Sequence, residues 1–347
     1  MRFKFFMEIN LTSDTVTRPS KEMLDAMRKA SVGDDVFKED PTVNLLESEL
    51  SKLFGKESAL FFPSGTMANQ TAIKINTEPG DQLICDHNSH VYNYEAGGAS
   101  FNSGVSCRLI FGDQGRIFSH QIKEVINPQD FYHSPKSKLI CVENTSNRGG
   151  GAFYDFKEIK KIKELAVKNN LKLHLDGARL WNALEETSEK PKDYGDIFDT
   201  ISVCFSKGLG CPVGSALIGS NKNMEKALRI RKVFGGGMRQ SGYLAAAALF
   251  ALENNRSDLK KDHIKAKEIA SVLTKLSFVK SIEPVSTNII IFSLTSNELE
   301  NKFVNLLKEK NIHIISLGKG KLRIVTHRDY TEKHHQYFLN FLKKLNL

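Results

Sequence analysis

The fold is decided by the stretch Thr200-Ile201-Ser202-Val203-Cys204-Phe205-Ser206-Lys207-Gly208-Leu209-Gly210, where an apolar, β-branched run meets a glycine-rich turn. The run predicts a buried strand, and Lys207 stands just after it. Burial and neighbouring cations lower a lysine's pKa and free its amine to act as a nucleophile. The plainer alternative is a strand-end lysine that points to water. The choice therefore depends on partners elsewhere in the chain.

Asp176 is the first such partner. It follows the alternating run Leu171-Lys172-Leu173-His174-Leu175, which is typical of a half-buried strand. In open α/β sheets, ligands collect at the carboxyl ends of the strands, where this carboxylate would lie. Alone, Asp176 would be interpreted as the N-cap of the next helix. Together with Lys207 it predicts a pyridoxal phosphate site, in which the lysine forms a Schiff base and the aspartate keeps the pyridine nitrogen protonated.

A phosphate cradle is predicted at Phe62-Pro63-Ser64-Gly65-Thr66-Met67-Ala68-Asn69. A strand ends at Phe62, Ser64 to Thr66 form a turn, and a helix is expected from Ala68 to Ile75. A helix N-terminus presents free N–H groups and the positive end of its dipole to an anion. Gly65 and Thr66 are the candidate phosphate ligands.

His90 follows the predicted strand Gln82–Cys85 and could stack on the ring or relay protons, although a structural role is equally open. With His87 and Asp86 it also resembles a metal patch. No matching cluster of further ligands accompanies these residues, and the five cysteines show no zinc spacing. We therefore expect no metal site.

The order of elements predicts an α/β fold. Strands and helices alternate up to about Gly219, which favours a mainly parallel sheet. From about Ser257 the order becomes helix, strand, strand, helix, strand, strand, helix, which suits a small α+β domain. We expect an N-terminal arm over residues 1–19, a large domain over 20–252 and a small domain over 253–347. Helices are predicted at 20–30, 44–54, 156–169, 224–234 and 244–252.

Bulk properties indicate a soluble, cytoplasmic protein. In its 347 residues, 40% are hydrophobic and 26% charged, and no apolar run approaches the length of a membrane span. The five cysteines lie in or beside strand-like runs and are expected to be reduced. The net charge of +9 is spread over amphipathic helices without a nucleic-acid signature. The first residues do not resemble a signal peptide, and either Met1 or Met7 is a candidate start.

Beyond these features, the chain from about Ile9 to Leu347 resembles the fold-type-I pyridoxal phosphate L-threonine aldolases of the β-eliminating lyase superfamily. The resemblance implies a large domain with a mainly parallel seven-stranded sheet and a smaller α+β domain. It rests on motifs in the family's order: Ser13-Asp14-Thr15-Val16-Thr17, Gly33-Asp34-Asp35-Val36, Glu39-Asp40-Pro41-Thr42, Pro63-Ser64-Gly65-Thr66-Met67, Glu143-Asn144-Thr145, His174-Leu175-Asp176-Gly177-Ala178-Arg179, Ser206-Lys207-Gly208-Leu209 and Gly235-Gly236-Gly237-Met238-Arg239-Gln240.

For the cofactor, the resemblance implies that Lys207 forms the Schiff base, Asp176 binds the pyridinium nitrogen and His90 stacks on the ring. Gly65 and Thr66 match the phosphate-binding turn.

For the substrate and the assembly, the resemblance implies five further assignments. Ser13, Arg179 and Arg323 match the groups that hold the substrate carboxylate, and an arginine fork suits that task. His133 matches a second active-site histidine linked to proton transfer. Arg239 matches an arginine that reaches the phosphate from the neighbouring subunit, so homodimers with shared active sites, which often pair into tetramers, are expected.

The implied reaction is cleavage of L-threonine, L-allo-threonine or related β-hydroxy-α-amino acids to glycine and an aldehyde. Three departures from the family pattern leave substrate preference and rate open. Phe37-Lys38 stands where Tyr-Gly is usual, Ser146 where a histidine is common, and Thr12 where an arginine is common. The alternatives are another pyridoxal phosphate β-eliminating lyase, an aminotransferase, or a non-catalytic, basic RNA-binding protein.

Overall fold

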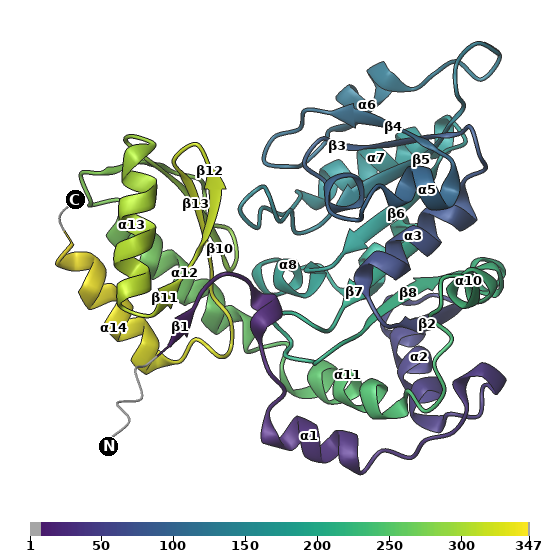
Figure 1. Ribbon diagram of the computed structural model, residues 1–347. Helices are drawn as coiled ribbons and strands as arrows, with labels where there is room; N and C mark the ends of the chain where they lie inside the picture. The colour runs from purple at the N-terminus through teal and green to yellow at the C-terminus, as the bar shows by residue number, and fades with distance from the viewer. Residues whose placement is uncertain (1–7, 346–347) are drawn as a thin grey trace.

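A seven-stranded, mainly parallel sheet forms the centre of the large domain in the computed structural model, which describes residues 8–345 (Figure 1). The strand order is β2-β8-β7-β6-β5-β3-β4, and only β8 runs antiparallel to its neighbours. This confirms the predicted sheet. The strands are β2 (Ser58–Phe62), β3 (Gln82–Asp86), β4 (Ser106–Ile110), β5 (Ser137–Glu143), β6 (Lys172–Gly177), β7 (Thr200–Cys204) and β8 (Ser215–Gly219).

Helices cover both faces of this sheet. One face packs against α3 and α10, and the other against α2, α7, α8, α9 and α11. The helices are α1 (Lys21–Arg28), α2 (Pro41–Phe54), α3 (Gly65–Asn76), α4 (His90–Asn93), α5 (Gly98–Ser103), α6 (Ser119–Val125), α7 (Phe156–Lys168), α8 (Leu180–Glu186), α9 (Pro191–Ile197), α10 (Asn221–Val233) and α11 (Gly242–Asn254). Because both faces are covered, the central strands are buried on both sides, and every residue of β7 is buried.

Three helices, α2, α3 and α10, begin three residues before their predicted starts, because polar side chains cap them. In α10 the Ser220 hydroxyl accepts from the Asn223 N–H, so the helix starts at Asn221 instead of Met224. The Asp40 carboxylate accepts hydrogen bonds from the backbone N–H groups of Thr42 and Val43, so α2 starts at Pro41 instead of Asn44. The Ser64 hydroxyl accepts from the Met67 N–H, so α3 starts at Gly65 instead of Ala68. Gly65 and Thr66 thus belong to the first turn of α3 and not to the preceding turn.

The small domain contains a four-stranded antiparallel sheet in the order β12-β13-β10-β9. Its order of elements agrees with the prediction, except for an added short strand, β11. The elements are α12 (Leu259–Leu273), β9 (Val279–Ile282), β10 (Ile289–Leu294), α13 (Glu298–Glu309), β11 (Ile312–His313), β12 (Ile315–Gly318), β13 (Lys321–Val325) and α14 (Glu332–Lys343).

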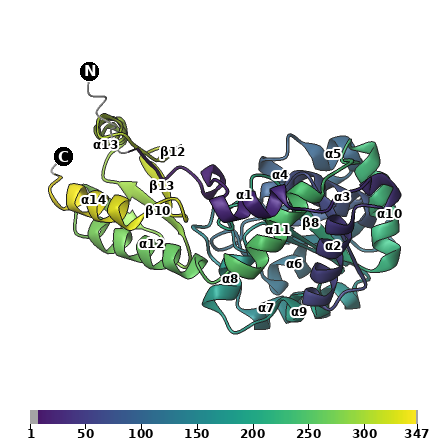
Figure 2. The same cartoon turned by 90° about the horizontal axis from the view of Figure 1, so that it is seen from below.

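The N-terminal arm crosses from one domain to the other (Figures 1 and 2). Strand β1 (Ile9–Asn10) pairs in parallel with β11 of the small domain. The arm then forms a short 3-10 helix, η1 (Asp14–Val16), beside the large domain, and a second, η2 (Asp35–Phe37), precedes α2. The expected boundary at residue 252 falls near the end of α11, and this division stays a prediction. The candidate starts Met1 and Met7 lie outside the described residues.

The five cysteines, which lie in the described residues, are all free thiols, as expected. Among residues 8–345, no helix combines the length and the apolar character that crossing a membrane requires.

Candidate active site

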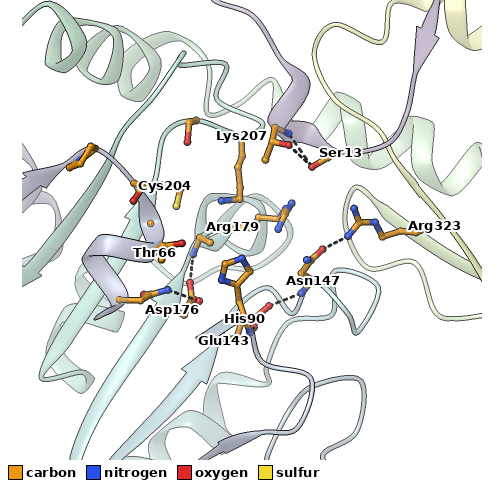
Figure 3. A pocket seen from close by; sticks show the side chains of 17 residues that line it. Ser13, Thr66, His90, Glu143, Asn147, Asp176, Arg179, Cys204, Lys207 and Arg323 are labelled. Carbon is orange, nitrogen blue, oxygen red and sulfur yellow. Dashed lines mark hydrogen bonds between the residues drawn. The ribbon is translucent and has the colours of Figure 1, made fainter. Parts of the chain in front are cut away.

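A cavity of about 340 Å³ lies at the carboxyl ends of β5, β6 and β7, where the arm and the small domain also reach (Figure 3). The cavity brings together eight of the ten predicted site residues. They are Ser13, Gly65, Thr66, His90, Asp176, Arg179, Lys207 and Arg323. Parallel strands explain the convergence, since their carboxyl ends meet at one edge of the sheet.

Lys207 lies in the turn after β7 and its side chain points into the cavity (Figure 3). Its backbone carbonyl accepts a hydrogen bond from the Thr17 hydroxyl at 2.8 Å, which ties the turn to the arm. Gly210 closes the turn with φ +82°, a conformation that favours glycine. Among the described residues the Lys207 amine has no hydrogen-bond or salt-bridge partner, so it is available to a ligand.

Asp176 is buried near the end of β6 and accepts hydrogen bonds from the Asn69 amide at 2.9 Å and the Ala178 N–H at 3.1 Å. The alternative role as a helix N-cap does not apply, because α8 begins at Leu180 with Arg179 in the cap position. Asn69 was not among the predicted site residues. It lies four residues after Gly65 on α3, a spacing that places both on one face of the helix.

The N-terminus of α3 forms an anion cradle beside Asp176 and Lys207. The first N–H groups of a helix lack partners within it and lie at the positive end of the dipole. Gly65 allows close packing here, because a Cβ at this position would lie 2.7 Å from the Cys204 sulfur. An anion cradle, a buried carboxylate and a free amine in one cavity fit the phosphate, the ring nitrogen and the aldehyde of pyridoxal phosphate.

His90 begins α4, and its Nδ1 lies 2.9 Å from the Glu95 carboxylate. Burial lowers the pKa of His90, but the Glu95 hydrogen bond and the charges of Asp176, Glu95 and Glu143 outweigh burial and raise it overall. Candidate ligand atoms of His90, Glu95 and Asp176 lie within 4.8 Å of one another, as they would around a metal ion. The Asn69 amide donates to the carboxylates of Glu95 and Asp176, so its N–H groups take the position between them that a metal ion would occupy.

Two arginines form the opposite side of the cavity. Arg179 binds the Asp14 carboxylate through two hydrogen bonds. Arg323 donates to the Asn147 side chain at 2.8 Å and to the Thr12 carbonyl at 3.0 Å. Burial and the neighbouring Arg179 charge lower the pKa of Arg323 to about 10. Arg179 is paired with Asp14, whereas Arg323 has no carboxylate partner among the described residues, so the cavity can accept another anion.

Glu143 is a buried carboxylate that the sequence motif contained without indicating a role. Its two oxygens accept the backbone N–H groups of His90 and Asn147, both at 2.8 Å. Burial and the nearby Asp176 charge raise the pKa of Glu143 to about 7. Glu143 thus joins the segment that carries His90 to the one that holds Arg323.

Two predicted residues, His133 and Arg239, do not line the cavity of their own chain. His133 is exposed on the loop before β5, and its ring lies against that of Tyr132, with 3.9 Å between the ring centroids and 32° between the planes. This loop leads into the amino end of the strand, whereas the cavity lies at the carboxyl end. Arg239 lies between α10 and α11, donates to Asp34 at 2.7 Å and has 53% of its side chain exposed.

Over nearly its whole length, the chain is similar to proteins that are named β-eliminating lyases or L-threonine aldolases. Residues 10–296 match the family described as beta-eliminating lyase. The sequence is 38% identical to probable low-specificity L-threonine aldolase 2 of Arabidopsis thaliana, over 97% of each chain. It is also 38% identical to the low specificity L-threonine aldolase of Escherichia coli K12, over 94% of this chain and 95% of that one.

Solved structures show the same fold. A threonine aldolase of Leishmania major superposes with a TM-score of 0.85 at 20% identity, covering 97% of this chain and 99% of that one. A structure of SPT with PLP superposes with a TM-score of 0.74 at 16% identity, covering 97% and 87%.

Proposed function

The chain belongs to the β-eliminating lyase family, and from this premise we propose that it is a pyridoxal-phosphate-dependent L-threonine aldolase. It would cleave L-threonine, L-allo-threonine and related β-hydroxy-α-amino acids to glycine and the corresponding aldehyde. One observation carries the proposal: a single cavity combines a free lysine amine, a buried carboxylate, a helix N-terminus and two buried arginines.

The residues of this cavity can hold pyridoxal phosphate at three points. Lys207 would bind the aldehyde, Asp176 would hold a proton on the ring nitrogen, and Gly65 and Thr66 would bind the phosphate at the α3 N-terminus. His90 would contact the ring. When bound, the cofactor supplies an electron sink for the bond that breaks.

The arginines and Ser13 are suited to hold the carboxylate of the amino acid. Arg323 is fixed by Asn147 and the Thr12 carbonyl, and Arg179 is fixed by Asp14. Because the Thr12 contact uses the main chain, it does not depend on the unusual side chain at this position. A substrate held by fixed groups needs little further ordering before the reaction, which accounts for a large part of many enzymes' acceleration.

His90 is our candidate to move a proton in the cavity. Its Nδ1 is bound to Glu95, and its Nε2 makes no hydrogen bond among the described residues. A neutral imidazole with a free nitrogen can take the proton of a substrate hydroxyl and return it later. We leave His133 out of this step, because in its own chain it lies on the loop that leads into the opposite end of β5.

We further propose that the enzyme is a cytoplasmic homodimer or tetramer with shared active sites. Arg239 supports this assembly, because it lies outside the cavity of its own chain with much of its side chain exposed, where a second subunit could use it. The free cysteines suit a reducing compartment.

The proposal is tested by incubating the purified protein with L-threonine and L-allo-threonine side by side. We expect equal amounts of glycine and acetaldehyde, visible absorbance from the cofactor, and loss of both signals in Lys207→Ala. Lys172→Ala, which changes an exposed lysine on β6, is the matched control and should keep both. Release of pyruvate and ammonia would instead identify another β-eliminating lyase, and transfer of the amino group would identify an aminotransferase. Borohydride trapping followed by peptide mapping should place the label on Lys207.

A further inference from the structure

Glu95 is a buried carboxylate between α4 and α5 that binds three side chains. It accepts hydrogen bonds from His90 Nδ1 at 2.9 Å, Asn69 Nδ2 at 2.9 Å and Gln70 Nε2 at 2.6 Å. The side chain of Glu95 is fully buried. The two amide nitrogens can only donate, so Glu95 acts as an acceptor toward them. The same role toward His90 requires the imidazole proton to be on Nδ1.

Asn69 connects Glu95 to Asp176. Its amide nitrogen donates to Glu95 and to Asp176, both at 2.9 Å. Its carbonyl oxygen accepts from Ser202 Oγ at 2.6 Å and from His174 Nε2 at 3.1 Å. Every hydrogen-bonding position of this buried amide is therefore used. A flipped amide would turn its oxygen toward two carboxylates, so only one orientation is stable.

We propose that Glu95 is a positioning residue, which keeps the proton of His90 on Nδ1, leaves Nε2 free to accept a proton, and fixes His90 relative to Asp176 through Asn69. This inference rests on the proposed function and adds to it a residue that does not line the cavity. A carboxylate that sets the tautomer of a histidine in this way acts through the imidazole, and losing it costs catalysis even when the fold is retained.

The charged groups that face His90 come from several elements. Glu95 lies after α4, Asp176 comes from β6, and Glu143 comes from β5 and binds the His90 backbone N–H. The ring of Tyr94 lies 5.7 Å from the imidazole. Burial lowers the pKa of His90, while the hydrogen bond to Glu95 and the three carboxylate charges raise it. Removing the charge of Glu95 should therefore lower the pKa of His90.

The test uses the holoenzyme labelled with ¹⁵N-histidine and the variant Glu95→Gln. This change keeps an oxygen that can accept from His90 and Asn69 but removes the charge. In the wild type, nitrogen chemical shifts should show neutral His90 with its proton on Nδ1. In Glu95→Gln, the pKa of His90 should fall, and the acidic limb of the kcat profile should move to lower pH. Turnover should drop about tenfold or more, with a smaller change in KM.

Gln70→Met is the matched control. It removes the third hydrogen bond to Glu95 but touches neither His90 nor Asp176. We expect Gln70→Met to lower the thermal midpoint of unfolding, as Glu95→Gln does. The tautomer of His90 and the acidic limb of the kcat profile should stay as in the wild type. The inference is overturned if neutral His90 carries its proton on Nε2 in the wild type, or if both variants change His90 equally. The wild-type tautomer needs no variant. The tautomer of His90 can be measured even in a protein that does not cleave threonine. Failure of the proposed function can therefore be distinguished from failure of this inference.

Discussion

Asp14 and Arg179 form a two-point ion pair between the N-terminal arm and the edge of the large sheet. Arg179 Nε lies 2.8 Å from one carboxylate oxygen of Asp14, and Arg179 Nη2 lies 2.6 Å from the other. Both residues are buried. Burial alone raises the pKa of Asp14, but the charge and hydrogen bonds of Arg179 and the charge of Lys207 outweigh burial and bring it to about 2. The pair thus fixes the arm and orients an arginine of the cavity.

Replacing Asp14 by Asn should destabilise the protein strongly, because Arg179 would remain buried without its counter-charge. Breaking such a pair costs about 3–5 kcal/mol of unfolding free energy, measurable by urea titration. Asp25→Asn is the control, since Asp25 and Arg28 form an exposed pair at 3.8 Å that should contribute less than about 1 kcal/mol. Because the folded pKa of Asp14 lies below the ordinary 3.8, the stabilisation is present above about pH 4 and is lost toward about pH 2. Equal losses for the two variants would contradict this prediction.

Glu143→Gln should change how stability depends on pH. The pKa of Glu143 is raised from 4.5 to about 7, so the folded state binds its proton more tightly than the unfolded state does. Stability from this group is therefore greatest below about pH 4.5 and declines as pH rises to about 7. Measured against Glu143→Gln, the wild type should lose about 1–3 kcal/mol across this window. A difference that stays constant between pH 5 and 8 would refute it.

Arg323→Lys should weaken substrate binding more than turnover. Lysine keeps the charge but cannot present the planar fork that grips a carboxylate at two points. KM for L-threonine should rise about tenfold or more, while kcat and the visible absorbance of the cofactor change less. Arg328→Lys is the control, because Arg328 donates to the Leu209 carbonyl and does not line the cavity. An unchanged KM would show that Arg323 does not hold the carboxylate.

Gly65→Ala should loosen the cofactor, because the added Cβ would lie 2.7 Å from the Cys204 sulfur and push the α3 N-terminus away. Overpacking of this kind costs about 1–3 kcal/mol, so the Kd for pyridoxal phosphate should rise about tenfold. The double variant Gly65→Ala with Cys204→Ala removes the clash and should recover most of the affinity. If the double variant binds no better than Gly65→Ala, contact with Cys204 is not the cause.

Arg239→Ala should weaken cofactor retention if Arg239 serves the active site of a neighbouring subunit. A dimer assembled from Arg239→Ala and Lys207→Ala chains would then contain one intact site and one doubly altered site. Mixing the two variants under conditions that exchange subunits should raise the activity above that of either variant alone. No recovery in mixtures whose exchange is verified by mass spectrometry would mean that each chain completes its own site.

The local pattern was sufficient for much of the fold and for the residues at strand ends. The β-branched run before Lys207 and the alternation before Asp176 correctly predicted that β7 and β6 are strands, because strand periodicity is a property of neighbouring residues. The expectation that β6 is half-buried was wrong, because helices cover both faces of the sheet and every residue of β6 after Lys172 is buried. Strand ends in a parallel sheet converge, so placing two such residues in one cavity required only the correct sheet type.

Contacts between distant segments were beyond local patterns. Asp14 and Arg179 are 165 residues apart, and Asn69 and Asp176 are 107 apart. The helices capped by Asp40 and Ser64 start earlier than the local pattern predicts, because the hydrogen bonds of the cap side chains outweigh a weak local preference for a turn.

The sequence alone therefore determined the α/β order of elements, the lysine, the aspartate and the glycine-led helix that suit one cofactor. The tertiary structure decided which carboxylate faces which cation, that Glu95 and Asn69 join His90 to Asp176, and that His133 and Arg239 lie outside the cavity of their own chain. The physical reason is that periodicity acts between neighbours along the chain. Hydrogen bonds and buried charges instead depend on strand order and packing, which bring together segments that no local pattern relates.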